Sequence, residues 1–187
     1  MALTIGRRRL LVGAGAAFAV APFSSALADV VPQVAAQGAR TLAFNNIHTG
    51  EKLKIDYWVD GTYVPDALQT INHLLRDYRN GQVHVIEPKL LDLLTVLRSR
   101  LETTEALEVI SGYRSPATNA MLHAESHGVA AKSLHMQGMA IDIRIPGRAL
   151  SVLHDMALNL RAGGVGYYPT SDFVHVDVGR VRHWGGV

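Results

Sequence analysis

The 187-residue chain contains no cysteine. This absence excludes disulfide bonds, a thiol nucleophile, lipoprotein anchoring and thiolate metal ligands. In an oxidising compartment, such a domain must be held together by its core and by any metal that it binds. A transition-metal site in this chain has to be built from histidine, aspartate or glutamate.

A strong excess of charge of one sign is also lacking, because the formal net charge is +2. Residues 1–28 contain Arg7, Arg8 and Arg9 and no acid, so 15 basic residues remain against 16 acidic ones when this segment is left out. That near balance removes the electrostatic support for nucleic-acid binding. We therefore expect no nucleic-acid partner.

No apolar run is long enough to be a convincing membrane span. The run at residues 10–21 follows the three arginines and precedes Ala26-Leu27-Ala28, a small-residue cleavage site. This order predicts a signal peptide at residues 1–28, and its arginines resemble a bacterial twin-arginine export signal. We expect a periplasmic protein without a membrane anchor after cleavage. Its mature part would have a flexible N-terminus at residues 29–40 and a single domain at residues 41–187.

Hydrophobic periodicity predicts an α+β fold, with helices packed on a central antiparallel sheet. Helical patterns occupy residues 65–80, 88–101, 116–126 and 148–160. Strand patterns occupy residues 42–47, 53–59, 107–112, 140–145, 163–168 and 173–178. Two hairpins follow from this spacing, and we place the first at a sheet edge. Asp77 is predicted to lie on the solvated face of the first helix.

Strand alternation collects polar side chains away from the core. Ile141 and Ile143 face one side of their strand and Asp142 the other, while His175 and Asp177 share a face opposite three valines. His135 precedes Asp142, and Gly138 between them allows the chain to turn close to a ligand. Each such residue alone is more often a surface residue than a ligand. The spacing is therefore compatible with a metal site without requiring one.

A longer pattern is more specific. Ser133-x-His135-x-x-Gly138-x-Ala140-x-Asp142 matches every fixed position of SxHxxGxAxD. The chain thereby resembles the zinc peptidases grouped with D-Ala-D-Ala carboxypeptidases, D-Ala-D-Ala dipeptidases of the VanX type and the hedgehog signalling domain. Over nearly its whole length it resembles the murein endopeptidase K subgroup, at the arginine-rich start and at residues 42–51, 111–115, 161–169 and 173–177.

The resemblance implies a Zn²⁺ cofactor bound by His135, Asp142 and His175. It also implies that Arg114 stabilises the oxyanion near the scissile carbonyl, and that Ser133 orients a ligand or the substrate.

Two residues remain candidates for the general base. Asp172 stands where related peptidases have the acid of an ExxH pattern, and Asp177 completes the H-x-D of the endopeptidase subgroup. We favour Asp177, because strand alternation places it on the face of His175.

Other side chains are candidates for substrate contact. Tyr167 and Tyr168 follow three glycines and could form aromatic walls on a flexible approach, while Gln137 and Lys132 could meet a carboxylate-rich peptide. Trp184 could close the cleft, although we favour core packing for it.

A second histidine pair, His123 and His127, has the i and i+4 spacing of helical zinc proteases. Those enzymes need glutamate directly after the first histidine, and this chain has Ala124 there. We therefore expect a polar helix face at this pair.

The implied reaction is hydrolysis by water that zinc activates, with a carboxylate as proton acceptor. The resemblance suggests a monomeric murein endopeptidase that cuts D-Ala–meso-diaminopimelate cross-links between peptidoglycan peptide stems. A D,D- or L,D-carboxypeptidase and a non-catalytic, zinc-stabilised peptidoglycan-binding domain are the alternatives.

Overall fold

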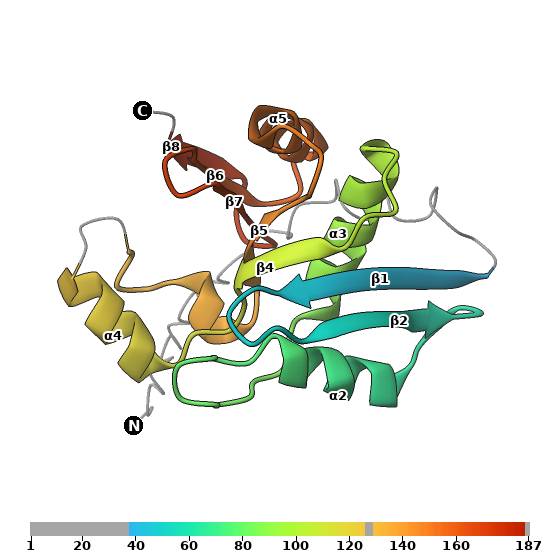
Figure 1. Ribbon diagram of the computed structural model, residues 1–187, viewed down its shortest axis with the longest axis horizontal. Coiled ribbons are helices and arrows are strands. Elements are labelled where there is room, and N and C mark those ends of the chain that lie inside the picture. Colours follow the sequence, from blue (N-terminus) through green and yellow to red (C-terminus); the bar gives the residue numbers. More distant parts are fainter. Residues whose placement is uncertain (1–37, 126–128, 186–187) are drawn as a thin grey trace, which may run out of the picture.

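The computed structural model of the protein describes residues 38–125 and 129–185 (Figure 1). The predicted signal peptide, most of the predicted N-terminal segment and His127 lie outside these ranges. The strands are β1 (Ala39–Asn46), β2 (Lys52–Val59), β3 (Thr62–Tyr63), β4 (Leu107–Ser111), β5 (Ala140–Arg144), β6 (Gly164–Tyr168), β7 (Phe173–Asp177) and β8 (Arg182–Gly185). The helices are α2 (Pro65–Leu74), α3 (Pro88–Arg100), α4 (Pro116–Glu125), α5 (Leu150–Leu160) and the 3₁₀ helix η2 (Leu134–Gln137).

All eight strands join one sheet in the order β3-β2-β1-β4-β5-β7-β6-β8. Neighbours among the central strands β4, β5, β7 and β6 pair antiparallel, as predicted. Parallel pairs join β1 to β4 and β6 to β8, so the sheet as a whole is mixed. The α+β class is confirmed. The first hairpin lies one strand in from the edge, because the two-residue β3 pairs with the outer side of β2.

Three α-helices, α2, α3 and α5, pack against the sheet, and α4 lies to one side of it (Figure 1). Helix α2 contacts β2, α3 contacts β1, and α5 contacts β6 and β7. The isoleucine face of β5 and the valine face of β7 are buried in the same hydrophobic cluster as the leucines of α3. Because alternate side chains of a strand face opposite ways, Asp142 and His175 are left on the other side of the sheet. Within the described ranges, no helix has the length and hydropathy needed to cross a bilayer.

The first helix ends earlier than its sequence pattern predicts, at Leu74. Asp77, which was predicted to be exposed, is only 1% exposed and turns inward. Its carboxylate accepts hydrogen bonds from the backbone N–H groups of Arg79 and Ser115. The buried carboxylate thus organises a loop and connects it to the start of α4, which explains why the helical pattern is not followed to residue 80.

Strand β1 starts at Ala39, two residues inside the segment predicted to be a flexible N-terminus. Arg40 explains why the strand begins this early, since its Nη1 donates to Asp92 Oδ1 of α3 at 2.6 Å. The guanidinium also lies over the ring of Trp58, 4.2 Å from the centroid. Tyr57 and Tyr63 donate their hydroxyls to the same buried carboxylate.

Candidate metal centre and cleft

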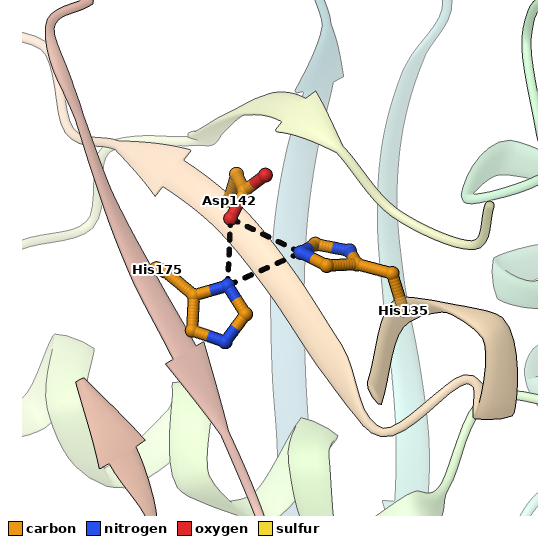
Figure 2. A group of neighbouring side chains, drawn as sticks. All are labelled: His135, Asp142 and His175. Carbon is orange, nitrogen blue, oxygen red and sulfur yellow. Dashed lines mark hydrogen bonds and ion pairs between the residues drawn. The ribbon is translucent and has the colours of Figure 1, made fainter. Parts of the chain in front are cut away.

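Three side chains from separate elements converge on one point (Figure 2). Asp142 of β5 and His175 of β7 are direct cross-strand partners, and His135 approaches from η2. His175 Nδ1 lies 2.9 Å from Asp142 Oδ1. His135 Nε2 lies 3.2 Å from the same oxygen and 3.1 Å from His175 Nδ1. All three residues are buried.

This donor set fits a divalent transition metal. The candidate ligand atoms lie within 4.8 Å of one another. Ligands about 2.0–2.1 Å from a tetrahedral zinc ion are about 3.3 Å apart, close to the observed separations. Two imidazoles and one carboxylate are also a ligand set of catalytic zinc sites, in which a further position is taken by water or substrate.

The hydrogen bonds behind the two imidazoles orient their lone pairs toward this point. His135 Nδ1 lies 2.7 Å from the carbonyl oxygen of Gly112 and must donate to it, which leaves Nε2 as an acceptor. Burial lowers the pKa of His135, so the ring is held neutral. His175 Nε2 lies 3.0 Å from Asp177 Oδ2, which leaves Nδ1 facing the other ligands. Burial alone would raise the pKa of Asp142, but the two imidazoles hold it well below its usual value.

The signature residues around His135 shape η2. Ser133 caps the 3₁₀ helix, and its Oγ accepts a hydrogen bond from the backbone N–H of His135. Gly138 ends the helix with a φ of +66°, a conformation that L side chains rarely adopt. A Cβ at this position would also collide with the backbone oxygen of Val85. Ser133 and Gly138 therefore fix where His135 points.

Arg114 places a positive group beside the candidate ligands. Its Nη2 lies 2.5 Å from Asp142 Oδ2 and 3.1 Å from His135 Nε2. Its Nε donates to Ser111 Oγ at 2.8 Å, which fixes the guanidinium in place. Arg114 is thus positioned to attract negative charge that develops next to the ligand group.

Asp177, the favoured candidate for the base, lies behind the His175 ring, on the side away from Nδ1. It is fully buried and does not line the cleft. Its two oxygens accept from the backbone N–H groups of Gly164 and Gly179 and from the guanidinium of Arg182. Burial would raise the pKa of Asp177, but the bonds from His175, Arg182 and the two glycines hold it far below its usual value. Such a carboxylate is a poor proton acceptor.

Asp172 lies on the turn between β6 and β7, with a φ of +54°. Its side chain is 61% exposed, and its Oδ2 accepts from Arg144 Nη1 at 2.9 Å. Asp172 itself does not line the cleft, but its neighbours Ser171 and Phe173 do. It therefore has access to solvent at the cleft margin, which Asp177 lacks.

The candidate ligands lie in a cleft of about 400 Å³. Its walls carry three cationic side chains, those of Arg114, Lys132 and Arg182. They also carry three aromatic side chains, those of Tyr168, Phe173 and Trp184. Since Asp142 is the only acid among the lining residues, the cleft is basic although the chain as a whole is nearly neutral. A ligand with carboxylate groups suits such walls.

Three aromatic or polar residues are placed differently from their predictions. Tyr167 does not line the cleft but stacks on His154 of α5, because it alternates with Tyr168 along β6. Gln137 is exposed on η2 and is also absent from the lining. Trp184, for which core packing was favoured, lines the cleft, with its ring centroid 5.1 Å from that of His175.

The second histidine pair is described only in part. His123 lies on α4 with Nδ1 2.5 Å from the carbonyl oxygen of Val129, so one ring nitrogen already has a local partner. Its companion lies outside the described residues.

Comparison with known proteins agrees with this geometry. A profile of the family described as peptidoglycan L,D-endopeptidase MepK matches residues 34–184. Peptidoglycan L,D-endopeptidase MepK of Escherichia coli (strain K12) is 44% identical over 182 residues, covering 95% of this chain and 96% of the relative. Probable peptidoglycan L,D-endopeptidase MepK of Haemophilus influenzae is 44% identical over 160 residues, covering 85% of this chain and 86% of the relative. The resemblance indicated by the sequence is thereby confirmed, and the chain belongs to this family of metallopeptidases.

Proposed function

We propose that this protein is a zinc-dependent endopeptidase that cuts L,D peptide cross-links of peptidoglycan. The observation that carries the proposal is the convergence of His135, Asp142 and His175 in a basic cleft. The established name of the relatives, peptidoglycan L,D-endopeptidase, supports the substrate and the bond, since the 44% identity extends over nearly the whole of both chains.

The proposed bond differs from the D-Ala–meso-diaminopimelate bond that was expected from the sequence. A bond from the carboxyl group of D-Ala has a D residue on its acyl side, so it is a D,D bond when the amine also lies on a D centre. The designation of the relatives is L,D, which requires an L centre on the acyl side. A cross-link between two diaminopimelate residues meets that description, and we propose it as the substrate bond.

His135, Asp142 and His175 would hold the metal, and a zinc ion there supplies a Lewis acid that polarises the peptide carbonyl and activates water. Arg114 offsets the negative charge that develops on the carbonyl oxygen, because its guanidinium already lies beside the ligand group. Ser133 acts indirectly, by capping the short helix that carries His135.

We assign the role of proton acceptor to Asp172 and not to Asp177. Its exposure and its position next to two lining residues support this assignment. Asp177 instead holds the imidazole of His175 in one orientation and one tautomer, as carboxylates behind ligand histidines do in other metal sites.

The walls of the cleft suit a peptidoglycan stem. Lys132 is exposed and offers an ammonium group to the free carboxylates of such a peptide. Tyr168 and Phe173 stack on each other with centroids 4.5 Å apart and provide an apolar surface for its aliphatic parts.

The proposed substrate lies outside the cytoplasmic membrane. We therefore propose a periplasmic location, reached through twin-arginine export directed by residues 1–28, whose composition supports such a signal.

Purified muropeptide dimers with either an L,D or a D,D cross-link test the proposal. The wild-type protein should convert the L,D dimer to monomers, lose this activity in chelator and regain it with zinc. His135→Ala should abolish cleavage, whereas His183→Ala, which changes an exposed histidine of β8, should retain it. Cleavage of the D,D dimer alone would refute the bond assignment, and shortened monomers would indicate a carboxypeptidase. Full activity of His135→Ala would refute the metal site.

A further inference from the structure

Two side chains of β8 reach across β6 to the site. The strand order is β7-β6-β8, so β6 separates β8 from the strand that carries His175 and Asp177. Arg182 nevertheless donates from Nη1 to Asp177 Oδ1 at 3.1 Å and from Nη2 to Oδ2 at 2.7 Å. A two-point bond between a guanidinium and a fully buried carboxylate fixes both position and orientation.

Glycines in β6 make this contact possible. Gly164 pairs with Arg182 and Gly166 with Trp184 across the β6–β8 ladder. A Cβ at Gly164 would collide with Arg182 Nη1 and Asp177 Oδ2, and one at Gly166 would lie 2.7 Å from the indole of Trp184. Both glycines have ordinary strand backbone without a positive φ. These two glycines are therefore required because no side chain fits there. The sequence led us to expect that they make the chain flexible, and the structure shows no such role.

A continuous chain of contacts connects Arg182 to the ligand group. Arg182 holds Asp177, Asp177 Oδ2 lies 3.0 Å from His175 Nε2, and His175 Nδ1 faces Asp142 and His135. Trp184 reinforces the arrangement in two ways. The Arg182 guanidinium lies 4.9 Å from the centroid of the Trp184 ring, and Trp184 Nε1 donates to the hydroxyl of Tyr168. Within the described residues, the side chains that bond the Asp177 carboxylate are those of His175 and Arg182.

We propose that Arg182 is a positioning residue for the metal ligand His175 and acts through Asp177. This inference rests on the metal site of the proposed function but not on the bond that is cleaved. Without the guanidinium, Asp177 Oδ1 would keep its two backbone donors, but Oδ2 would keep only its bond to His175. The orientation of Oδ2, and with it that of the His175 ring, would then be held less firmly. Carboxylates that bond a ligand histidine, as Asp177 does, contribute about 10- to 100-fold to metal affinity.

The experiment compares Arg182→Ala with Arg180→Ala, which removes the same charge from an exposed neighbouring position. Zinc affinity is measured by competition with a chromophoric chelator, and site geometry by the visible absorption of the Co²⁺-substituted protein. Arg182→Ala should weaken zinc binding by about tenfold or more and alter the Co²⁺ spectrum, while Arg180→Ala should change neither.

Two further variants separate positioning from folding. Gly164→Ala keeps both charged groups but displaces them, so it should also weaken zinc binding. In Arg182→Ala combined with Asp177→Asn, the loss of affinity should be no larger than in Asp177→Asn alone, because the arginine acts through that carboxylate. Circular dichroism of the metal-free variants verifies that each is folded, and Arg182→Lys replaces Arg182→Ala if the latter is not.

Unchanged zinc affinity and Co²⁺ spectrum in the Arg182 variants, even with lowered thermal stability, would show a purely structural role and overturn the inference. Additive losses in the double variant would do the same. A wild-type protein that binds no zinc would overturn this inference together with the metal site. Normal zinc binding with no cleavage of either dimer would remove only the proposed reaction.

Discussion

Asp172 and Asp177 are close in sequence and have opposite surroundings. Asp177 is fully buried, and its oxygens are saturated by backbone, imidazole and guanidinium donors. Asp172 is largely exposed and has one ion pair, with Arg144. A proton acceptor has to exchange protons with water, whereas a residue that orients an imidazole has to be fixed. The two carboxylates are therefore suited to different tasks.

Asp172→Asn should lower kcat by about 10²-fold or more, the contribution typical of a general base. Zinc affinity should stay at the wild-type value, because Asp172 contacts none of the candidate ligands. Asparagine tolerates the positive φ of this turn, so the backbone should be unaffected. Rates on the L,D dimer and chelator competition measure the two effects separately.

Arg144→Gln is the control, since it breaks the same ion pair, together with the one to Glu108, and leaves the Asp172 carboxylate in place. Its kcat should remain near wild type. An equal loss of rate in both variants would assign Asp172 a structural role in the turn and leave the base unidentified.

The short helix η2 shows how a single element places a ligand. Ser133 fixes its start, and Gly138 fixes its end in the left-handed region. The carbonyl of Gly138 also accepts from the backbone N–H of Glu87, which connects η2 to the segment before α3. Because a Cβ at Gly138 would collide with the backbone oxygen of Val85, a side chain there has to push η2 away from Val85, and we expect this to displace His135.

Gly138→Ala should therefore destabilise the protein by about 1 kcal/mol or more, the cost of a left-handed non-glycine residue. It should also weaken zinc binding. Gly147→Ala is a suitable control, because Gly147 also has a positive φ but no atom within 4 Å of its would-be Cβ. Thermal unfolding should show a loss for both variants, and weaker zinc binding for Gly138→Ala alone.

Periodicity was sufficient to predict the long elements and the faces of β5 and β7, because alternation of isoleucine or valine with polar residues is a local property. It could not predict β8, whose parallel pairing with β6 depends on contacts distant in sequence. The same limit applies to Asp77, whose burial depends on a backbone donor at Ser115. The glycines of β6 were misinterpreted for a related reason. These glycines leave room for Arg182 and Trp184 of β8, and a pattern of neighbouring residues along β6 carries no information about that other strand.

In the whole molecule, the candidate metal site joins the sheet to η2 without any disulfide. A ligand that binds only the native state raises the free energy of unfolding by RT ln(1 + [L]/Kd). The metal should therefore contribute to global stability as well as to catalysis.

At a free zinc concentration 100-fold above Kd, the gain should be about 2.7 kcal/mol. For a chain of this length, that corresponds to a rise in Tm of about 5–10 °C. Differential scanning calorimetry with zinc and with chelator measures the shift. His135→Ala should show almost none of it, while His183→Ala should show all of it. Equal shifts in these two variants would mean that the stabilising ion binds elsewhere.

The candidate ligands differ in how firmly the fold holds them. Asp142 and His175 face each other across one β-ladder, so they separate only if β5 and β7 part. His135 is carried by a single short turn of chain, which can open by itself at a much smaller cost in free energy. The ion should consequently enter and leave past His135, at a rate governed by this local opening. A chelator should then remove the metal and inactivate the enzyme without unfolding it, so that added metal restores the activity.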